Sequence, residues 1–178
     1  MLQSIASSHS ARPSQNAVDL LASCHQKIRY FTSVVSRLAH SEGSPLPEIS
    51  AAADSAYRYF TVALPLHEAD EEESLRPRLL ELSAPEIANA LDAMVQQHQA
   101  VDDLIERVVP ILMLVANNPA KLPQAHGELC TISKALTEIF QGHLELEEGV
   151  IFPAVLQKLS AASQEGLLQE MQERRKQG

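Results

Sequence analysis

One pattern of residues occurs twice in this chain, and its repetition limits the folds that the chain can adopt. In each copy a histidine is followed by glutamates at the fourth and fifth positions, an aliphatic residue at the eighth and proline at the tenth; the copies occupy residues 67–77 and 143–153. Four residues turn a helix through about 400°, so the histidine and the first glutamate share one face. Imidazole nitrogen beside carboxylate oxygen suits iron, manganese or zinc. The predicted ligand pairs are His67 with Glu71 and His143 with Glu147.

Apolar residues recur every three or four positions along four long segments, which is typical of helices with one buried face. We expect helices over about 16–40 and 48–82, a third that begins at 83 and is kinked or ended by Pro110, and a fourth that starts between 120 and 128 and runs to about 159. Short segments rich in glycine, proline and asparagine separate them. The pattern therefore predicts four helices joined by short turns.

Local signals refine these boundaries. Ser83 and Glu86 have the spacing of a capping box at the start of the third helix. Pro65 and Pro77 lie inside the second segment, where each should bend or interrupt the helix. Ser160 is placed to cap a short last helix that packs on the others. The apolar residues of that helix are Leu167, Leu168 and Met171, and its charged end, residues 173–176, is expected to reach solvent.

Each half of the chain places a lone histidine on one helix and a copy of the motif on the next. His25 precedes the first copy and His98 precedes the second, at similar separations. These helices favour an all-α fold, an antiparallel up-down four-helix bundle with a short extra C-terminal helix. We expect the bundle over residues 16–178, after a flexible leader over residues 1–15. The repeat predicts two equivalent half-sites about a pseudo-twofold axis.

Two interpretations of the buried polar residues are open. One is a polar network inside the bundle without metal. Burying these groups without partners would, however, cost roughly several kcal/mol for each ionised group. A metal centre removes that cost, and we favour it. The predicted metal ligands are His25, His67, Glu71, His98, His143 and Glu147.

Composition restricts the partners of the chain. The net charge of -9 argues against a phosphate-binding surface, so nucleic acid is not an expected partner. No apolar run reaches a membrane-spanning length, and residues 1–5 lack the features of a signal peptide. We therefore expect a soluble, cytoplasmic protein with no membrane partner. Cys24 and Cys130 have no zinc-type spacing and are expected to be buried free thiols.

A lone histidine, a His-xxx-Glu-Glu motif that ends in proline, a second lone histidine and a second copy of the motif resemble the hemerythrin-like HHE cation-binding domain family. The resemblance covers residues 16–159. It implies a non-haem di-iron centre, two iron ions joined by an oxo or hydroxo group. It also implies that Glu71 and Glu147 bridge the metals and that the histidines are terminal ligands, namely His25, His67, His98 and His143.

The sequence departs from two branches of that family. Oxygen-carrying hemerythrins have a fifth histidine one turn along the third helix, where this chain has Asp102. The set of four histidines and two glutamates is more similar to a branch linked to iron–sulfur cluster repair and nitric-oxide handling. That branch has a cysteine-containing N-terminal domain that this sequence does not include. Whether Asp102 or Glu72 joins the metal shell is left open at this point.

Ligand counting gives the expected chemistry. Six protein ligands shared by two irons leave positions open for dioxygen, nitric oxide or peroxide. Apolar neighbours should keep the pocket dry, which favours reversible binding or sensing over oxygenation. These neighbours are Ile28, Phe60, Met94 and Ile139. The alternatives are an enzyme that acts on nitric oxide or peroxide, iron–sulfur cluster repair, and an interaction module that responds to iron or oxygen.

The ligand histidines also need acceptors for their second ring nitrogens. The candidates are Glu68, Glu72, Asp102 and Glu148. Tyr30 and Tyr57 could face the pocket, although a tyrosine on a bundle helix usually packs. His40 and His126 are expected near helix ends, outside the site. Cys24 adjoins His25 and therefore points about 100° away from it, so it is not an expected ligand.

Overall fold

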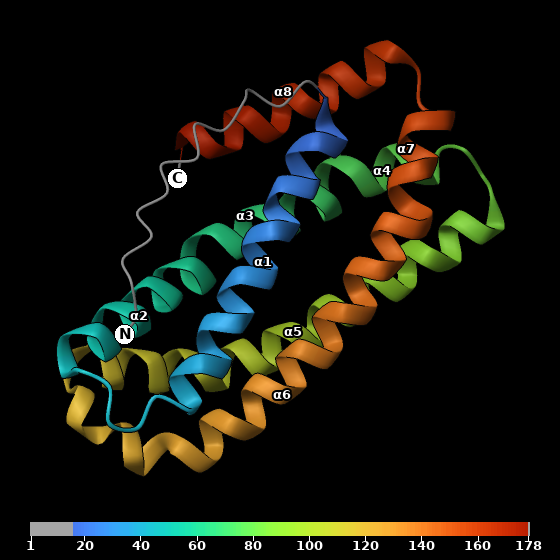
Figure 1. Cartoon of the computed structure of the whole chain (residues 1–178). Coiled ribbons are helices and arrows are strands. Elements are labelled where there is room, and N and C mark those ends of the chain that lie inside the picture. Colours follow the sequence, from blue (N-terminus) through green and yellow to red (C-terminus); the bar gives the residue numbers. More distant parts are fainter. Residues whose placement is uncertain (1–15, 178) are drawn as a thin grey trace.

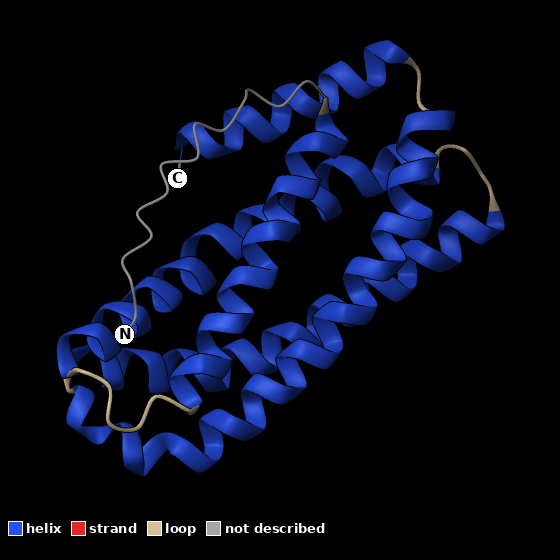
Figure 2. Ribbon diagram, in the orientation of Figure 1, coloured by secondary structure: helices blue, strands red, loops and turns tan. Residues whose placement is uncertain are grey.

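The structure is a computed structural model that describes residues 16–177. Within this range the chain is helical except for short turns, and no strand occurs (Figure 2). The predicted leader and His9 lie outside the described residues. Among the helices of residues 16–177, none is long and apolar enough to cross a membrane.

Four columns of helix form an up-down bundle (Figure 1). The first column is α1 (Ala17–Ala39), and the third is α5 (Pro85–Asn117). The second contains α2 (Leu46–Arg58), α3 (Leu64–Ala69) and α4 (Arg76–Leu80). After a 3-10 turn, η3 (Pro119–Lys121), the fourth contains α6 (Leu122–Leu146) and α7 (Phe152–Lys158). Because α1 packs on α2 and α6, and α5 packs on the same two helices, the columns stand in a square.

The second and fourth columns continue through wide π-helical turns rather than breaking. These turns are η1 (Tyr59–Ala63), η2 (Asp70–Leu75) and η4 (Glu147–Ile151). Each ends two residues before a proline, at Pro65, Pro77 and Pro153. The residue before each proline donates its N–H to the carbonyl five positions back. A widened turn accommodates the proline ring and its missing donor, so the predicted interruptions are π turns within continuous helix.

Several boundaries agree with the prediction. Asn16 caps α1 by accepting a hydrogen bond from the backbone N–H of Asp19 at 2.9 Å. Ser160 accepts one from the N–H of Ser163 at 3.2 Å, at the start of α8 (Ala161–Gln177). In α8, Leu167 and Met171 are fully buried, as expected for a helix that packs on the bundle. Figure 1 shows α8 running back along the end of the bundle.

One prediction about α5 is wrong, and a second is narrowed by the structure. Ser83 does not cap it: this residue has a left-handed backbone, with φ of 52°, and Ala84 is the N-cap without a side-chain hydrogen bond. Pro85 at the first helical position has no N–H to cap and a suitable φ, which makes a capping box unnecessary. Pro110 does not end the helix, so of the two effects predicted for it the kink alone stays a prediction. The buried residues on both sides, Val108 and Leu112, hold the helix through the loss of one hydrogen bond.

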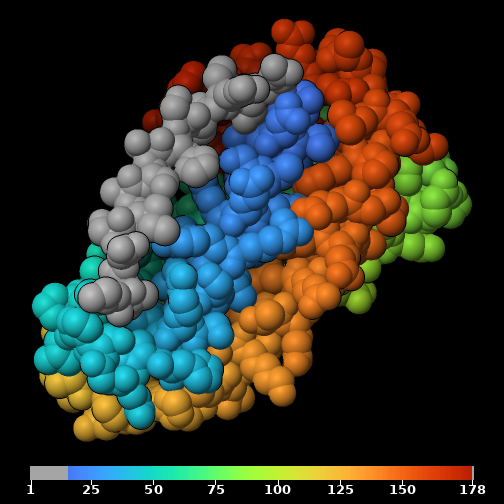
Figure 3. Space-filling model, in the orientation of Figure 1, coloured from blue at the N-terminus to red at the C-terminus, as the bar shows by residue number. Residues whose placement is uncertain are grey.

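A polar layer divides the interior into two apolar clusters. One contains Ile28, and the other, which lies against α8, contains Leu21. His25 lies between these two residues on α1, and His98 lies in the same way between Met94 and Val101 on α5. On the face that Figure 3 shows, α1 packs beside α6 and α7. The sequence therefore positions its polar side chains midway along the bundle.

Candidate metal centre

All six predicted ligands lie in this polar layer. Each column contributes at least one, and the two motif glutamates lie within the π turns η2 and η4. All six residues are buried, and the exposed fraction of each is at most 3%. They are His25 on α1, His67 on α3, Glu71 in η2, His98 on α5, His143 on α6 and Glu147 in η4. The structure thus brings together every residue that the sequence named, and their role as metal ligands stays a prediction.

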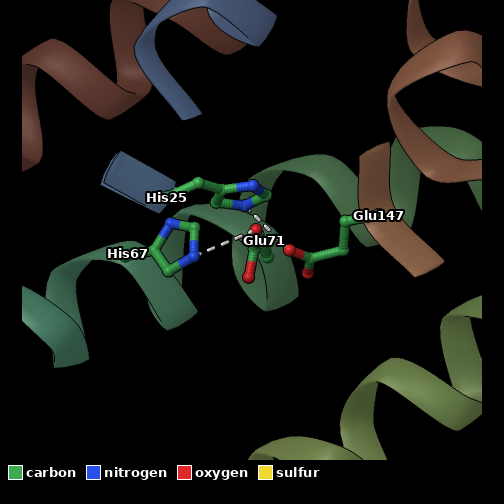
Figure 4. A group of neighbouring side chains, drawn as sticks. All are labelled: His25, His67, Glu71 and Glu147. Carbon is green, nitrogen blue, oxygen red and sulfur yellow. Dashed lines mark ion pairs between the residues drawn. The ribbon is translucent and has the colours of Figure 1, made fainter. Parts of the chain in front are cut away.

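The six residues form two groups of four that share both carboxylates. The first group contains His25 and His67 with Glu71 and Glu147, and the second contains His98 and His143 with the same two glutamates. Within each group one ligand atom from every residue lies within 4.8 Å of the others. Figure 4 shows the first group, with Glu147 reaching toward the two imidazoles from a different helix. Each group has the size of a single-metal site.

Each glutamate extends between the two groups. The oxygens of Glu71 lie 3.4 Å from His67 Nε2 and 3.2 Å from His98 Nε2. Those of Glu147 lie 3.3 Å from His143 Nε2 and 2.9 Å from His25 Nε2. Among residues 16–177, all four oxygens and the Nε2 atoms of His25, His67 and His98 lack a partner with hydrogen-bond geometry. Buried polar atoms normally have such partners, so this set of inward-facing atoms fits bound cations.

Outer hydrogen bonds fix the orientation of three imidazoles. The Nδ1–H of His25 donates to Glu148 at 2.8 Å, and that of His98 donates to Glu72 at 2.7 Å. His143 Nδ1 donates to Gln97 at 3.2 Å. These bonds leave Nε2 free to face the centre of the bundle, which is how proteins prepare histidine for a metal.

The predicted acceptors are therefore partly correct. Glu72 and Glu148 are confirmed as partners, and they sit outside the two groups of possible ligands. Asp102 is exposed, so it takes no such part. Gln97 was missed because an uncharged residue one position before a ligand gives no signal of its own. His67 Nδ1 finds no hydrogen-bond partner within the described part of the chain.

Burial sets the pKa values of the site. Desolvation raises the pKa of Glu71 well above its usual range and that of Glu147 to about 8. Desolvation also lowers the pKa of His67 well below its usual range and that of His143 to about 3. The protein alone thus favours neutral side chains here. A divalent cation reverses this preference for the carboxylates, because it supplies the charge that burial removes.

The other residues singled out from the sequence lie at the edge of the site or away from it. Tyr30 is 55% exposed, so the suggestion that it faces the pocket is wrong. Tyr57 is half-buried and lines a separate surface cavity together with Met113. The buried tyrosine is Tyr59, which stacks on Phe31 with ring centroids 4.2 Å apart. A residue of mixed polarity cannot be assigned to one helical face from periodicity alone.

Further residues can be placed against their predictions. Ile28, Phe60 and Met94 are fully buried, but Ile139 is only half-buried, and Phe140 takes the core position beside it. His40 and His126 lie together at helix ends with ring centroids 6.4 Å apart, outside both groups, as expected. The cysteines are free, although Cys130 is only half-buried.

The expectation that residues 173–176 reach solvent is wrong for two arginines. Arg174 and Arg175 both form ion pairs with Asp70, a fully buried residue that directly precedes Glu71. Charge pattern gave a weak signal, because a basic run at the end of the chain can neutralise the acidic run at 70–73. Only the packing of α8 reveals which residues meet.

A four-helix bundle with a buried histidine and glutamate site defines the class of this protein as a helical, cation-binding domain. The sequence model of the family described as Hemerythrin HHE cation binding domain matches residues 16–155. The chain therefore belongs to this family. A comparison with curated proteins found no match.

Proposed function

We propose that the chain is a di-iron protein that binds dioxygen or a related diatomic molecule, for storage, sensing or detoxification. The observation that carries the proposal is the pair of ligand groups that share Glu71 and Glu147. Each group offers two imidazole nitrogens and two carboxylates, a donor set that suits iron better than calcium or magnesium. Two irons held by this set would supply redox chemistry and coordination positions for a small ligand.

The residues around the ligands support binding at a fixed geometry. Glu148 and Glu72 orient His25 and His98 through hydrogen bonds of 2.8 and 2.7 Å. Gln97 does the same for His143. Such outer bonds fix the ring orientation and raise the basicity of the ligand nitrogen. These three imidazoles are therefore preorganised for metal binding.

The apolar clusters on both sides of the site exclude water. Ile28 and Phe60 come from one cluster and Met94 from the other, and none is more than 1% exposed. A dry pocket protects a bound diatomic molecule from protons of the solvent. This surrounding favours reversible binding over cleavage of the bond between its atoms.

Metal content and an ultraviolet–visible spectrum test the proposal. Protein purified from iron-supplemented cells is analysed by mass spectrometry, and its spectrum is recorded through cycles of oxygen addition and removal. We expect about two irons per chain and charge-transfer bands that change reversibly with oxygen. Two irons without a reversible change would contradict gas binding. Absence of metal after reconstitution would contradict the centre itself.

One observation favours a second candidate, an enzyme that acts on nitric oxide or peroxide. Glu68 follows His67, and its Oε1 is buried without a hydrogen-bond partner among the described residues. Burial, followed by the charge of Asp102, raises the pKa of Glu68 to about 7. A carboxyl in this position is a possible proton donor to a reacting molecule. Glu68→Gln separates the candidates, because it should abolish turnover of peroxide or nitric oxide but leave reversible gas affinity nearly unchanged.

A further inference from the structure

Helix α8 lies beyond the part of the chain that the family model matches, yet it packs next to the metal centre. The match ends at residue 155, and α8 covers Ala161–Gln177. Its main contacts are with α1 and with η2, the turn that contains Glu71. Leu167 and Met171 attach it to the apolar cluster at that end of the bundle. The family domain in this chain therefore carries an additional helix against one side.

Asp70 joins α8 to the ligand-bearing turn. It is fully buried, directly before Glu71 and three residues after His67. Its Oδ2 lies 2.5 Å from Arg175 Nη2, and its Oδ1 pairs with Arg174. Arg174 also donates to Ser74 Oγ at 3.1 Å and pairs with Glu73 at 3.1 Å. Arg174 holds the buried carboxylate by a hydrogen bond and Arg175 by a close ion pair, and two cations on one buried carboxylate restrain the turn more than an exposed ion pair does.

The same α8 residues reach the helix of a second ligand. Arg175 Nη2 lies 3.5 Å from the sulfur of Cys24, which directly precedes His25 on α1. The Arg175 guanidinium thus contacts Asp70 in η2 and Cys24 on α1. Each of these two residues directly precedes a predicted ligand. Both histidines of the first group, His25 and His67, lie on segments beside these contacts. The histidines of the second group come from α5 and α6.

The second copy of the motif lacks this arrangement. Leu146 stands where the first copy has Asp70, and it packs against the apolar cluster. His67 is also the ligand histidine whose Nδ1 has no hydrogen-bond partner within residues 16–177. Its orientation is consequently set by α3 and by the η2 turn that follows it, and not by a bond to its ring.

We propose that Asp70 is a positioning residue: together with Arg174 and Arg175 it forms a clamp that makes the first ligand group bind its metal more tightly than that group would without α8. The proposal rests on the proposed metal centre and not on the identity of the diatomic ligand. It predicts that the two metal positions depend differently on α8. The clamp acts through α1, which carries His25, and through η2, which carries Glu71 and directly follows the helix of His67, and it contacts no metal itself.

Cobalt(II) titration of metal-free protein tests the clamp, because its visible absorption reports N/O coordination without turnover. His143→Ala leaves the first group intact, and His67→Ala leaves the second. The clamp is removed in each background by Asp70→Leu with Arg174→Gln and Arg175→Gln, which copies Leu146 and leaves no unpaired buried charge. We expect cobalt affinity to fall at least about tenfold in the His143→Ala background. In the His67→Ala background the fall should be at least about threefold smaller, because Glu71 is the one ligand of the second group that lies on a segment the clamp contacts.

Two control variants separate positioning from general loss of structure. Glu170→Gln removes a different α8 contact, the 2.6 Å ion pair with Arg78, keeps the Arg78 hydrogen bond to the Ser74 carbonyl in η2, and should leave both affinities unchanged. Arg174→Lys with Arg175→Lys keeps both charges and should restore most of the affinity. Circular dichroism checks that every variant is folded.

Equal losses in both backgrounds, or the same loss with Glu170→Gln, would overturn the proposal, because α8 would then act only on overall stability. Unchanged affinity after clamp removal would overturn it as well. If the wild-type chain binds no cobalt, the metal centre itself is wrong and the clamp falls with it. These failures are distinguishable, since only the last one affects the wild-type protein.

Discussion

The two copies of the motif have the same skeleton but differ in what they do besides offering ligands. Both place a histidine and a glutamate in the site, and both widen into a π turn before proline. In both, the second glutamate reaches across to the lone histidine of the other half: Glu72 holds His98, and Glu148 holds His25. Each half therefore orients a ligand of the other. This exchange explains why neither half would form a complete site alone.

The two copies differ at the positions that lie between the residues of the shared motif. The first copy has the half-buried Glu68 and the buried Asp70, whereas the second has Leu144 and Leu146 at these positions. Leu144 and Leu146 belong to the apolar surroundings, and Asp70 connects to α8. The comparison teaches that the ligand geometry restricts only part of the helical turn. The remaining positions are free to serve packing in one copy and helix attachment in the other.

The largest effect should follow from removing a shared carboxylate. Glu71→Ala and Glu147→Ala each take a ligand from both groups, so each should reduce bound iron from about two per chain to nearly none. Mass spectrometry of the purified variants measures this. His67→Ala serves as the comparison, because it belongs to one group and should leave about one metal. A Glu71→Ala protein that keeps one iron would contradict the shared arrangement.

Loss of an outer hydrogen bond should have a smaller effect, and it should appear in the opposite half. Glu148→Gln lies on the second motif but orients His25, so it should weaken metal binding by the first group about 10-fold to 100-fold. Glu72→Gln should do the same to the second group through His98. Cobalt titration in the single-group backgrounds measures each effect. If metal binding weakens only in the half that contains the mutated glutamate, the two halves do not orient each other's histidines.

Metal-free protein should lose stability as the pH rises from 6 to 8. Burial raises the pKa of Glu147 to about 8, so the folded state holds a proton that the unfolded state has already released above its ordinary pKa. The free energy of unfolding should therefore fall by about 1–2 kcal/mol as the carboxyl titrates. Urea unfolding at the two pH values measures the change. Glu147→Gln should remove this contribution but keep those of Glu71, His67 and His143, so its profile should differ from that of the wild type by about 1–2 kcal/mol between the two pH values. Metal-loaded protein should not follow the profile.

The smallest effect on metal binding should follow from removing the ion pair between Arg29 and Glu148 of the second motif. This exposed arginine pairs with Glu148 at 2.9 Å. Exposed ion pairs contribute about 0.2–1 kcal/mol, so Arg29→Gln should weaken metal binding by the first group no more than about fivefold. Isothermal titration calorimetry can resolve a change of this size. Arg58→Gln, which removes an exposed pair with Asp54 away from the site, is the matched control and should have no effect.

Sequence reasoning predicted the bundle and the six buried residues that meet in the polar layer, because both depend on spacing along single helices, and the role of the six as metal ligands stays a prediction. The motif fixes which side chains share a face, and apolar periodicity determines that this face is buried. The pairing of Arg175 with Asp70 could not be predicted in this way, since it joins segments more than a hundred residues apart. The role of Gln97 depends likewise on how α5 meets α6. The left-handed Ser83 follows from a turn whose path is set by the helices on either side.

The polar layer between the two apolar clusters has a consequence for how the protein opens. Neither cluster crosses the layer, so the two ends of the bundle are joined there mainly by backbone and by the six inward side chains. A pair of bound cations would act as an internal cross-link between them. Without it, we expect amide hydrogens at the two ends to exchange with separate opening free energies, as in two weakly coupled cooperative units. Metal binding should then bring the opening free energies of the two ends together, which hydrogen exchange can measure.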